Sequence, residues 1–135
     1  MQTLEQRIIK FRGVGGPDGS PKLYYGQLST DNACTTSYAK THKHRICWTT
    51  KDGGYANIPV KIGTVGQFTG LHDSIGVPIY EGDIVFNDFL KGEVIFEDGS
   101  FTTPFSAENE PLSVRAGLMV IGNIFGITAF GGELI

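Results

Sequence analysis

Short runs of alternating apolar and polar residues recur along this chain, and glycines and prolines separate one run from the next. The clearest runs are residues 84–86 and 93–97, whose β-branched and aromatic side chains favour strands. Asp98-Gly99 ends the second run, and an Asp-Gly pair between two such runs is typical of a two-residue type I′ hairpin. That turn would pair Phe96 with Phe101 and bring two aromatic rings together on one face.

The same pattern predicts further short strands, at residues 7–12, 23–28, 45–50, 55–60, 62–68 and 118–125. The last of these is a near-continuous apolar run, as expected for a strand that is buried on both sides or closes a barrel. Residues 13–21 are expected to form a loop, and residues 30–43 are polar without periodicity. No window of ten or more residues combines helical periodicity with helix caps.

Length and composition agree with a mostly β fold. A chain of 135 residues can bury a core of its own and is expected to form a single domain over residues 1–135. Its 19 glycines and six prolines, with 19% charged residues, suit many turns between short strands better than long helices.

The charge and cysteine content exclude several classes of protein. A net charge of −3 gives no general attraction to nucleic acid or to an anionic membrane. Two cysteines do not make a disulfide framework, and the N-terminus does not resemble a secretory signal. The most apolar segment, residues 117–132, is shorter than the about 20 apolar residues that span a bilayer. We therefore expect a cytoplasmic protein without a membrane partner.

Four residues carry atoms that could bind a metal, Cys34, His42, His44 and Cys47. Their spacing, C-x7-H-x-H-x2-C, departs from the closely paired ligands of common zinc sites. The alternative is two buried cysteines beside a solvated His-Lys-His loop, and we expect no metal.

The sequence gives equally weak signals for a catalytic site and for a cofactor-binding site. The acidic group near the central turns has simpler explanations as turn and surface residues, and it comprises Glu81, Asp83, Asp88, Glu97 and Asp98. The glycines at 13–16 superficially match a dinucleotide-binding loop, but its third glycine would fall on Asp18 and no helix pattern follows. We expect no catalytic residues and no cofactor.

One stretch of the chain carries a specific signature. Residues 66–71 read GQFTGL, residues 73–76 form an Asp-x-x-Gly turn, and residues 79–85 read IYEGDIV. In the same order come residues 9–12 (IKFR) before them, and residues 92–101 (GEVIFEDGSF) and 120–125 (VIGNIF) after them. With these segments, the chain resembles the YopX family of phage and prophage proteins. It departs from the family at Gly13-Val14, where a small residue and tryptophan are usual, and residues 30–55 match no motif.

The resemblance implies a small, mostly β protein with an SH3-like barrel around the IYEGDIV strand, elaborated with additional strands and hairpins. It brings no established catalytic or binding residues to carry over. The resemblance implies no known activity. Together with the barrel pattern and the lack of a coherent active site, it favours a non-enzymatic interaction module encoded by a phage or mobile element, with a host or phage protein as partner or with a second copy of itself in a homo-oligomer.

Two functions from different classes remain open. For the interaction module, the candidate partner contacts are Trp48, Tyr80, Glu81 and His72. The alternative is a small β-barrel that binds single-stranded nucleic acid through aromatic and basic residues. Its support is a local basic cluster close to Trp48, made of Lys40, His42, Lys43, His44 and Arg45. The acidic balance of the chain argues against this alternative.

Overall fold

The structure, a computed structural model, describes residues 8–16, 19–30, 44–87, 91–103 and 117–132. The strands are β1 (Phe11–Gly15), β2 (Lys22–Thr30), β3 (His44–Thr49), β4 (Tyr55–Val60), β5 (Gly66–His72), β6 (Pro78–Tyr80), β7 (Asp83–Phe86), β8 (Lys91–Glu93), β9 (Ile95–Glu97), β10 (Ser100–Thr102), β11 (Met119–Asn123) and β12 (Phe130–Gly132). The described part of the chain is therefore mostly β, as its sequence predicts.

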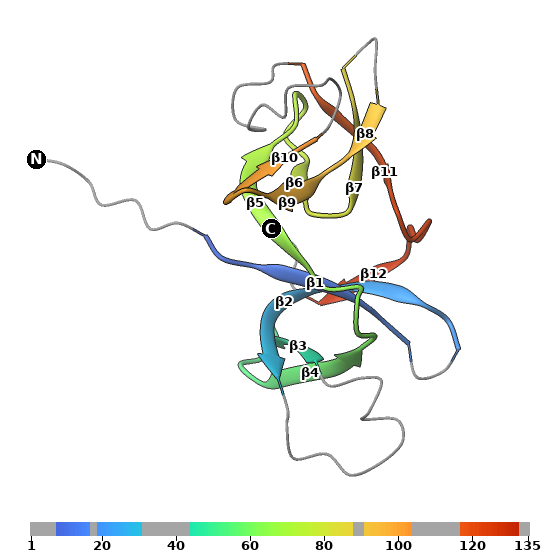
Figure 1. Ribbon diagram of the computed structural model, residues 1–135. Helices are drawn as coiled ribbons and strands as arrows, with labels where there is room; N and C mark the ends of the chain where they lie inside the picture. The colour runs from blue at the N-terminus through green and yellow to red at the C-terminus, as the bar shows by residue number, and fades with distance from the viewer. Residues whose placement is uncertain (1–7, 17–18, 31–43, 88–90, 104–116, 133–135) are drawn as a thin grey trace, which may run out of the picture.

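Seven of these strands form the main sheet. Its order is β4-β3-β2-β1-β5-β6, and β12 pairs with β2 in parallel. The other pairings are antiparallel, and β1 lies between β2 and β5. In Figure 1, β5 runs from this sheet toward the remaining strands. The main sheet thus supplies one side of the molecule and the connection to the other.

The other side is a cluster of short strands, in which β7 pairs with β11 and β8, and β9 pairs with β10. We call it the β7–β11 cluster, and Figure 1 shows it above β1 to β4 and β12, with β6 and the end of β5 beside it. Its core consists of Ile79, Val85, Val94 and Leu118, which are at most 4% exposed. Leu71, Phe101 and Val120 pack against that core.

The central hairpin is confirmed. Asp98 and Gly99 have φ angles of 52° and 81°, as a type I′ turn requires. The register pairs Phe96 with Phe101, and their ring centroids lie 5.1 Å apart in an edge-on arrangement.

Two predicted strands are displaced along the chain, since β1 spans residues 11–15 rather than 7–12 and β5 spans residues 66–72 rather than 62–68. Two further local predictions are wrong. The glycines at 13 and 15 do not form a loop but lie within β1. A Cβ atom at Gly13 would come within 2.8 Å of the Val60 side chain. The missing side chain lets β1 and β4 approach closely. Residues 118–125 are not one continuous buried strand, since β11 has a bulge between Val120 and Gly122 and leaves Ile121 54% exposed.

The strand pairings of the described residues form three sheets and close no barrel. The observed class is therefore mostly β and predominantly antiparallel. The described residues also contain no helix that is long and apolar enough to cross a membrane.

A substitution at the central turn tests how much the hairpin contributes to stability. Gly99→Val should lower the free energy of unfolding by about 1 kcal/mol or more, because a β-branched residue at positive φ is strained. Gly99→Asn should lose less, since asparagine tolerates that region. Urea unfolding of both variants checks the expectation, and equal stability of Gly99→Val and wild type would contradict it.

Candidate functional site

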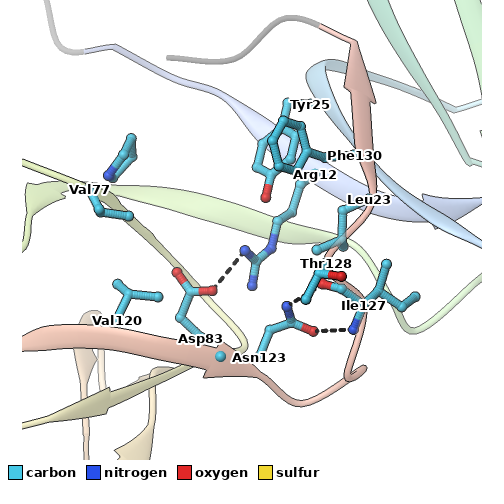
Figure 2. A pocket seen from close by; sticks show the side chains of 12 residues that line it. Arg12, Leu23, Tyr25, Val77, Asp83, Val120, Asn123, Ile127, Thr128 and Phe130 are labelled. Atoms are coloured by element: carbon cyan, nitrogen blue, oxygen red, sulfur yellow. Dashed lines mark hydrogen bonds and ion pairs between the residues drawn. The ribbon is translucent and has the colours of Figure 1, made fainter.

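An open pocket of about 230 Å³ lies where the main sheet meets the β7–β11 cluster. Its lining residues come from β1, β2, β6, β7, β11, β12 and the segments beside them: Arg12, Leu23, Tyr25, Val77, Pro78, Asp83, Val120, Gly122, Asn123, Ile127, Thr128 and Phe130. Figure 2 shows the Arg12 side chain running between Tyr25 and Asp83 in the middle of this group.

The floor of the pocket is a buried ion pair. Arg12 Nη1 lies 2.8 Å from Asp83 Oδ1, and the two side chains are 3% and 4% exposed. Arg12 Nη2 also donates to the carbonyl oxygen of Glu81 at 3.3 Å. The guanidinium carbon stands 5.1 Å from the centroid of the Tyr80 ring, which is the geometry of a cation–π contact.

Asp83 is held in place by the turn that precedes it. Gly82 has a φ of 91°, which favours glycine, and its N–H donates to the carbonyl of Val94. The backbone N–H of Tyr80 donates to Asp83 Oδ2 at 2.8 Å. The interpretation of Asp83 as a turn residue is therefore confirmed, but the sequence did not reveal its pairing with Arg12.

The electrostatics of the floor are dominated by burial. Burial raises the pKa of the Asp83 carboxyl, and the guanidinium of Arg12 opposes that shift. Burial also raises the pKa of the Tyr80 phenol, with the neighbouring Tyr25 adding to the effect. The ion pair carries no net charge, and Tyr80 stays neutral beside it.

Asp73 fixes one wall of the pocket. Its Oδ1 accepts backbone N–H groups from Ile75 and Val77, and its Oδ2 accepts the N–H of Val120 at 3.0 Å. Although burial raises the pKa of Asp73, these backbone donors lower it below its usual value. The carboxylate thus joins the turn after β5 to β11.

Asn123 fixes the opposite wall. Its Nδ2 donates to the carbonyl of Ile127 at 2.9 Å, and its Oδ1 accepts the N–H of Phe125 at 3.0 Å. Figure 2 shows the contact between Asn123 and the backbone of Ile127. Because the amide is engaged by the loop it shapes, it serves the structure of the wall.

The mouth of the pocket is aromatic and apolar. The Tyr25 ring packs edge-on against Tyr80 at 5.1 Å and against Phe130 at 6.4 Å. Phe130 is 57% exposed and Val77 is 38% exposed, so both present apolar surface to solvent. Polar floor and apolar mouth together suit an amphipathic occupant.

The four residues predicted as partner contacts do not form one surface. Tyr80 is 2% exposed and lies beneath Tyr25 and Arg12, so it presents almost no surface to a partner in this structure. Glu81 is half-buried, and its carboxylate accepts the backbone N–H of Gln67. His72 is exposed at the end of β5, with its ring edge-on to Phe68. Trp48 is half-buried on β3, four strands from Tyr80 in the sheet order.

The residues that line the pocket gave little signal of their own in the sequence. Arg12 and Asp83 both lie in segments of the family resemblance, but nothing local pairs them across 70 intervening residues. Phe130 stands alone in the glycine-rich end of the chain. Arg12 can be identified as a buried residue only when the three-dimensional structure places the Asp83 carboxylate beside it.

The other sequence candidates remain dispersed. Cys34, His42 and Asp88 lie outside the described residues, and Cys47 is a buried free thiol on β3. Glu97 and Asp98 are exposed on the β9–β10 hairpin. Among the residues that the structure describes, no three His, Cys, Asp or Glu side chains gather to hold a metal.

The basic cluster proposed for nucleic acid is only partly described. Lys40, His42 and Lys43 lie outside the described residues. Arg45 and Trp48 are three positions apart in β3, so their side chains point to opposite faces of the sheet. One face of the Trp48 ring is also covered by Tyr24, whose centroid lies 5.9 Å away in a stacked arrangement.

Comparison with known proteins identifies a family. The sequence model of the YopX protein family matches residues 20–126, which is most of the chain. The crystal structure of protein EF1440 from Enterococcus faecalis aligns with a TM-score of 0.49 and 22% identity, over 88% of this chain and 94% of that one. No curated protein sequence matches the chain. The family match includes Asp73, Asp83 and Asn123, whereas Arg12 and Phe130 lie on either side of it.

The acid limb of the stability profile tests the role of Asp73. Because its pKa is lower in the folded protein, the carboxylate stabilises the fold above the unfolded value near 3.8, and this stabilisation is lost as pH falls through the folded pKa. Asp73→Asn places an amide group among backbone donors and should cost about 1–3 kcal/mol at pH 7. The difference from wild type should shrink below about pH 4.

Chemical unfolding of both proteins at several pH values between about 2.5 and about 7 measures this difference. Asp98→Asn is the matched control, since Asp98 is exposed in a turn that asparagine also suits. A cost for Asp73→Asn that does not change with pH would show that the carboxylate charge contributes nothing.

Proposed function

This chain belongs to the YopX protein family, and we propose that it is a non-enzymatic interaction module encoded by a phage or another mobile element. The proposal places it in the cytoplasm, with a protein of the host or of the phage as its partner. The observation that carries the proposal is the apolar mouth of the pocket described above.

Phe130 and Val77 give this surface its character. Both line the pocket, and they leave 57% and 38% of their area exposed. Exposed apolar patches mark interaction sites, and aromatic side chains are enriched in the buried centres of protein interfaces. Burial of these two side chains against a partner would supply the hydrophobic part of the binding free energy.

The state of the buried carboxylates supports a role without catalysis. A general acid or base needs a carboxyl that can exchange a proton with a substrate. Asp83 is engaged by Arg12 and by the N–H of Tyr80, and Asp73 accepts three backbone N–H groups. Each carboxylate therefore has a structural explanation.

The fold around the IYEGDIV strand and the assembly of the chain are part of the same proposal. Val85 and Val94 are fully buried in the β7–β11 cluster, and the N–H of Gly82 donates to the carbonyl of Val94, between β8 and β9. These contacts between successive short strands support an SH3-like barrel around residues 79–85. A second copy of the chain that covers the pocket mouth would make the module a homo-oligomer.

A second candidate is binding of single-stranded nucleic acid. The stacked pair of Tyr24 and Trp48 favours it, because aromatic rings provide stacking platforms for bases. An electrophoretic shift titration with single-stranded DNA and RNA at two salt concentrations tests it. Binding that weakens with salt and is lost in Trp48→Ala would favour this candidate over the module.

Site-specific photo-crosslinking tests the interaction module. A benzophenone amino acid at position 130 should trap a discrete partner in the native host cell, because Phe130 lies at the pocket mouth. Position 96 is the matched control, since Phe96 is 56% exposed on the distant β9–β10 hairpin, compared with 57% for Phe130.

The trapped protein is then purified and titrated against the variants. Phe130→Ala should weaken its binding by about tenfold or more, and Phe96→Ala should change it little. A partner that is a second copy of this chain would establish the homo-oligomer. Crosslinks that form equally at both positions, or at neither, would contradict the proposed surface.

A further inference from the structure

Positive and negative charges are segregated along this chain. Residues 1–65 carry nine lysines and arginines against four aspartates and glutamates, whereas residues 66–135 carry two against ten. The formal charges of the two segments are therefore +5 and −8, which together give the net charge of −3. Charge asymmetry between the halves of a chain indicates that one half binds an oppositely charged partner.

The fold separates these charges in space. Between residues 8 and 65, the described part of the chain contains β1 to β4 with six basic residues and one acidic residue, namely Lys10, Arg12, Lys22, Arg45, Lys51, Lys61 and Asp52. Arg12 is neutralised by Asp83, so five cations remain for one carboxylate. In Figure 1, β3 and β4 lie at the end of the molecule away from the β7–β11 cluster. The end that contains β3 and β4 is therefore positively charged.

One face of β2, β3 and β4 points outward. The register sets Arg45 opposite Pro59 and Thr49 opposite Tyr55. Residues directly opposite each other, and residues two apart in a strand, share one face of a sheet. Ile46, which is fully buried, points to the other face. We call the outward face the polar face, and its exposed or half-buried members are Gln27, Ser29, Arg45, Thr49, Tyr55 and Asn57.

The polar face combines hydrogen-bonding side chains with one exposed aromatic ring. Tyr55 is 70% exposed. Arg45 Nη1 donates to Asn57 Oδ1 at 2.8 Å, which holds the guanidinium on this face. The centre of a protein interface is apolar and depleted in charge, unlike this face. A single-stranded nucleic acid, by contrast, is bound by basic side chains along its phosphates and by aromatic rings that stack on its bases.

Two lysines extend the positive charge to both ends of the polar face. Lys51 lies in the turn between β3 and β4, close to Tyr55, and Lys61 directly follows β4. Both are exposed. The six residues of β4 span about 17 Å, so one extended strand of a few nucleotides can reach from one lysine to the other. Stacking on Tyr55 requires an unpaired base, which favours a single strand over a duplex.

We infer that the polar face of β2, β3 and β4 binds a single-stranded nucleic acid. Tyr55 stacks on a base, and Arg45, Lys51 and Lys61 contact the phosphates. The inference rests on the nucleic-acid candidate named above for the class of ligand. It assigns that ligand to the face of β3 opposite the one that carries Trp48, and it leaves the pocket mouth to the protein partner.

Salt-dependent binding of oligonucleotides to the full-length protein tests the inference. Fluorescence anisotropy measures the binding of labelled oligothymidylate and oligouridylate of about 15 nucleotides. Between about 50 and about 200 mM salt, three phosphate contacts predict a slope of about −2 for the logarithm of the association constant against that of the salt concentration. A duplex of the same length and poly-glutamate should bind about fivefold more weakly or less, because neither offers an unpaired base.

Two results would overturn the inference at this stage. One is the absence of binding to either oligonucleotide. The other is equally tight binding of poly-glutamate or of the duplex, which would show that charge alone selects the ligand and would point to an acidic protein or to double-stranded DNA.

Variants locate the ligand on the polar face. Tyr55→Ala should weaken binding about fivefold or more, and Tyr55→Phe, which keeps the ring, should not. Lys61→Gln should make the salt slope shallower by about 0.7, since one phosphate contact is lost. Lys91→Gln is its matched control, because Lys91 is also exposed but lies on β8 in the acidic half. Unchanged affinity of Tyr55→Ala, or equal effects of the two lysine variants, would contradict the assignment.

The inference and the candidate on which it rests fail in different ways. Binding that is lost in Trp48→Ala and retained in Tyr55→Ala would overturn the assignment to the polar face and leave the nucleic-acid candidate standing. A wild-type protein that binds no oligonucleotide would overturn both. The interaction module is tested separately, by the variants of Phe130 and Phe96.

Discussion

The ion pair between Arg12 and Asp83 is the interaction on which the two sides of this molecule depend. Arg12 belongs to β1 in the middle of the main sheet, and Asp83 begins β7 in the β7–β11 cluster. Two charges that are at most 4% exposed must each have a partner, because removal from water is unfavourable for either alone. Docking of the cluster onto the sheet satisfies both at once.

The pocket follows from this contact. Arg12 occupies the space between the two sides and binds the carbonyl of Glu81, so the strands around it cannot close completely. The chain packs closely elsewhere, as at Gly66, where a Cβ atom would lie 2.5 Å from the Glu81 carbonyl oxygen. Asp73 and Asn123 then hold the two walls through backbone hydrogen bonds. Side chains that resemble catalytic or ligand-binding groups in the sequence thus fix the walls and the floor of the pocket.

Local features of this fold could be predicted from the sequence, and features that depend on distant contacts could not. The Asp98-Gly99 turn and the positive φ of Gly82 follow from residues next to one another. The burial of Tyr80 depends on Tyr25 and Arg12, which come from two other strands. The close approach of Gly13 to Val60 explains why β1 runs through a glycine-rich segment that reads as a loop. The candidate site was missed for the same reason, since Arg12, Asp83 and Phe130 meet in space and not in sequence.

A double-mutant cycle on the ion pair tests this account most directly. Asp83→Asn keeps an acceptor for Tyr80, and Arg12→Met keeps an unbranched apolar stem without the charge, so the cycle isolates the coupling between the two charges. Each single variant should lower the free energy of unfolding by about 3–5 kcal/mol, because it leaves one buried charge alone. The double variant should cost less than the sum by about 1–3 kcal/mol. Additivity within about 0.5 kcal/mol would contradict the account, because it would mean that the two charges do not stabilise one another.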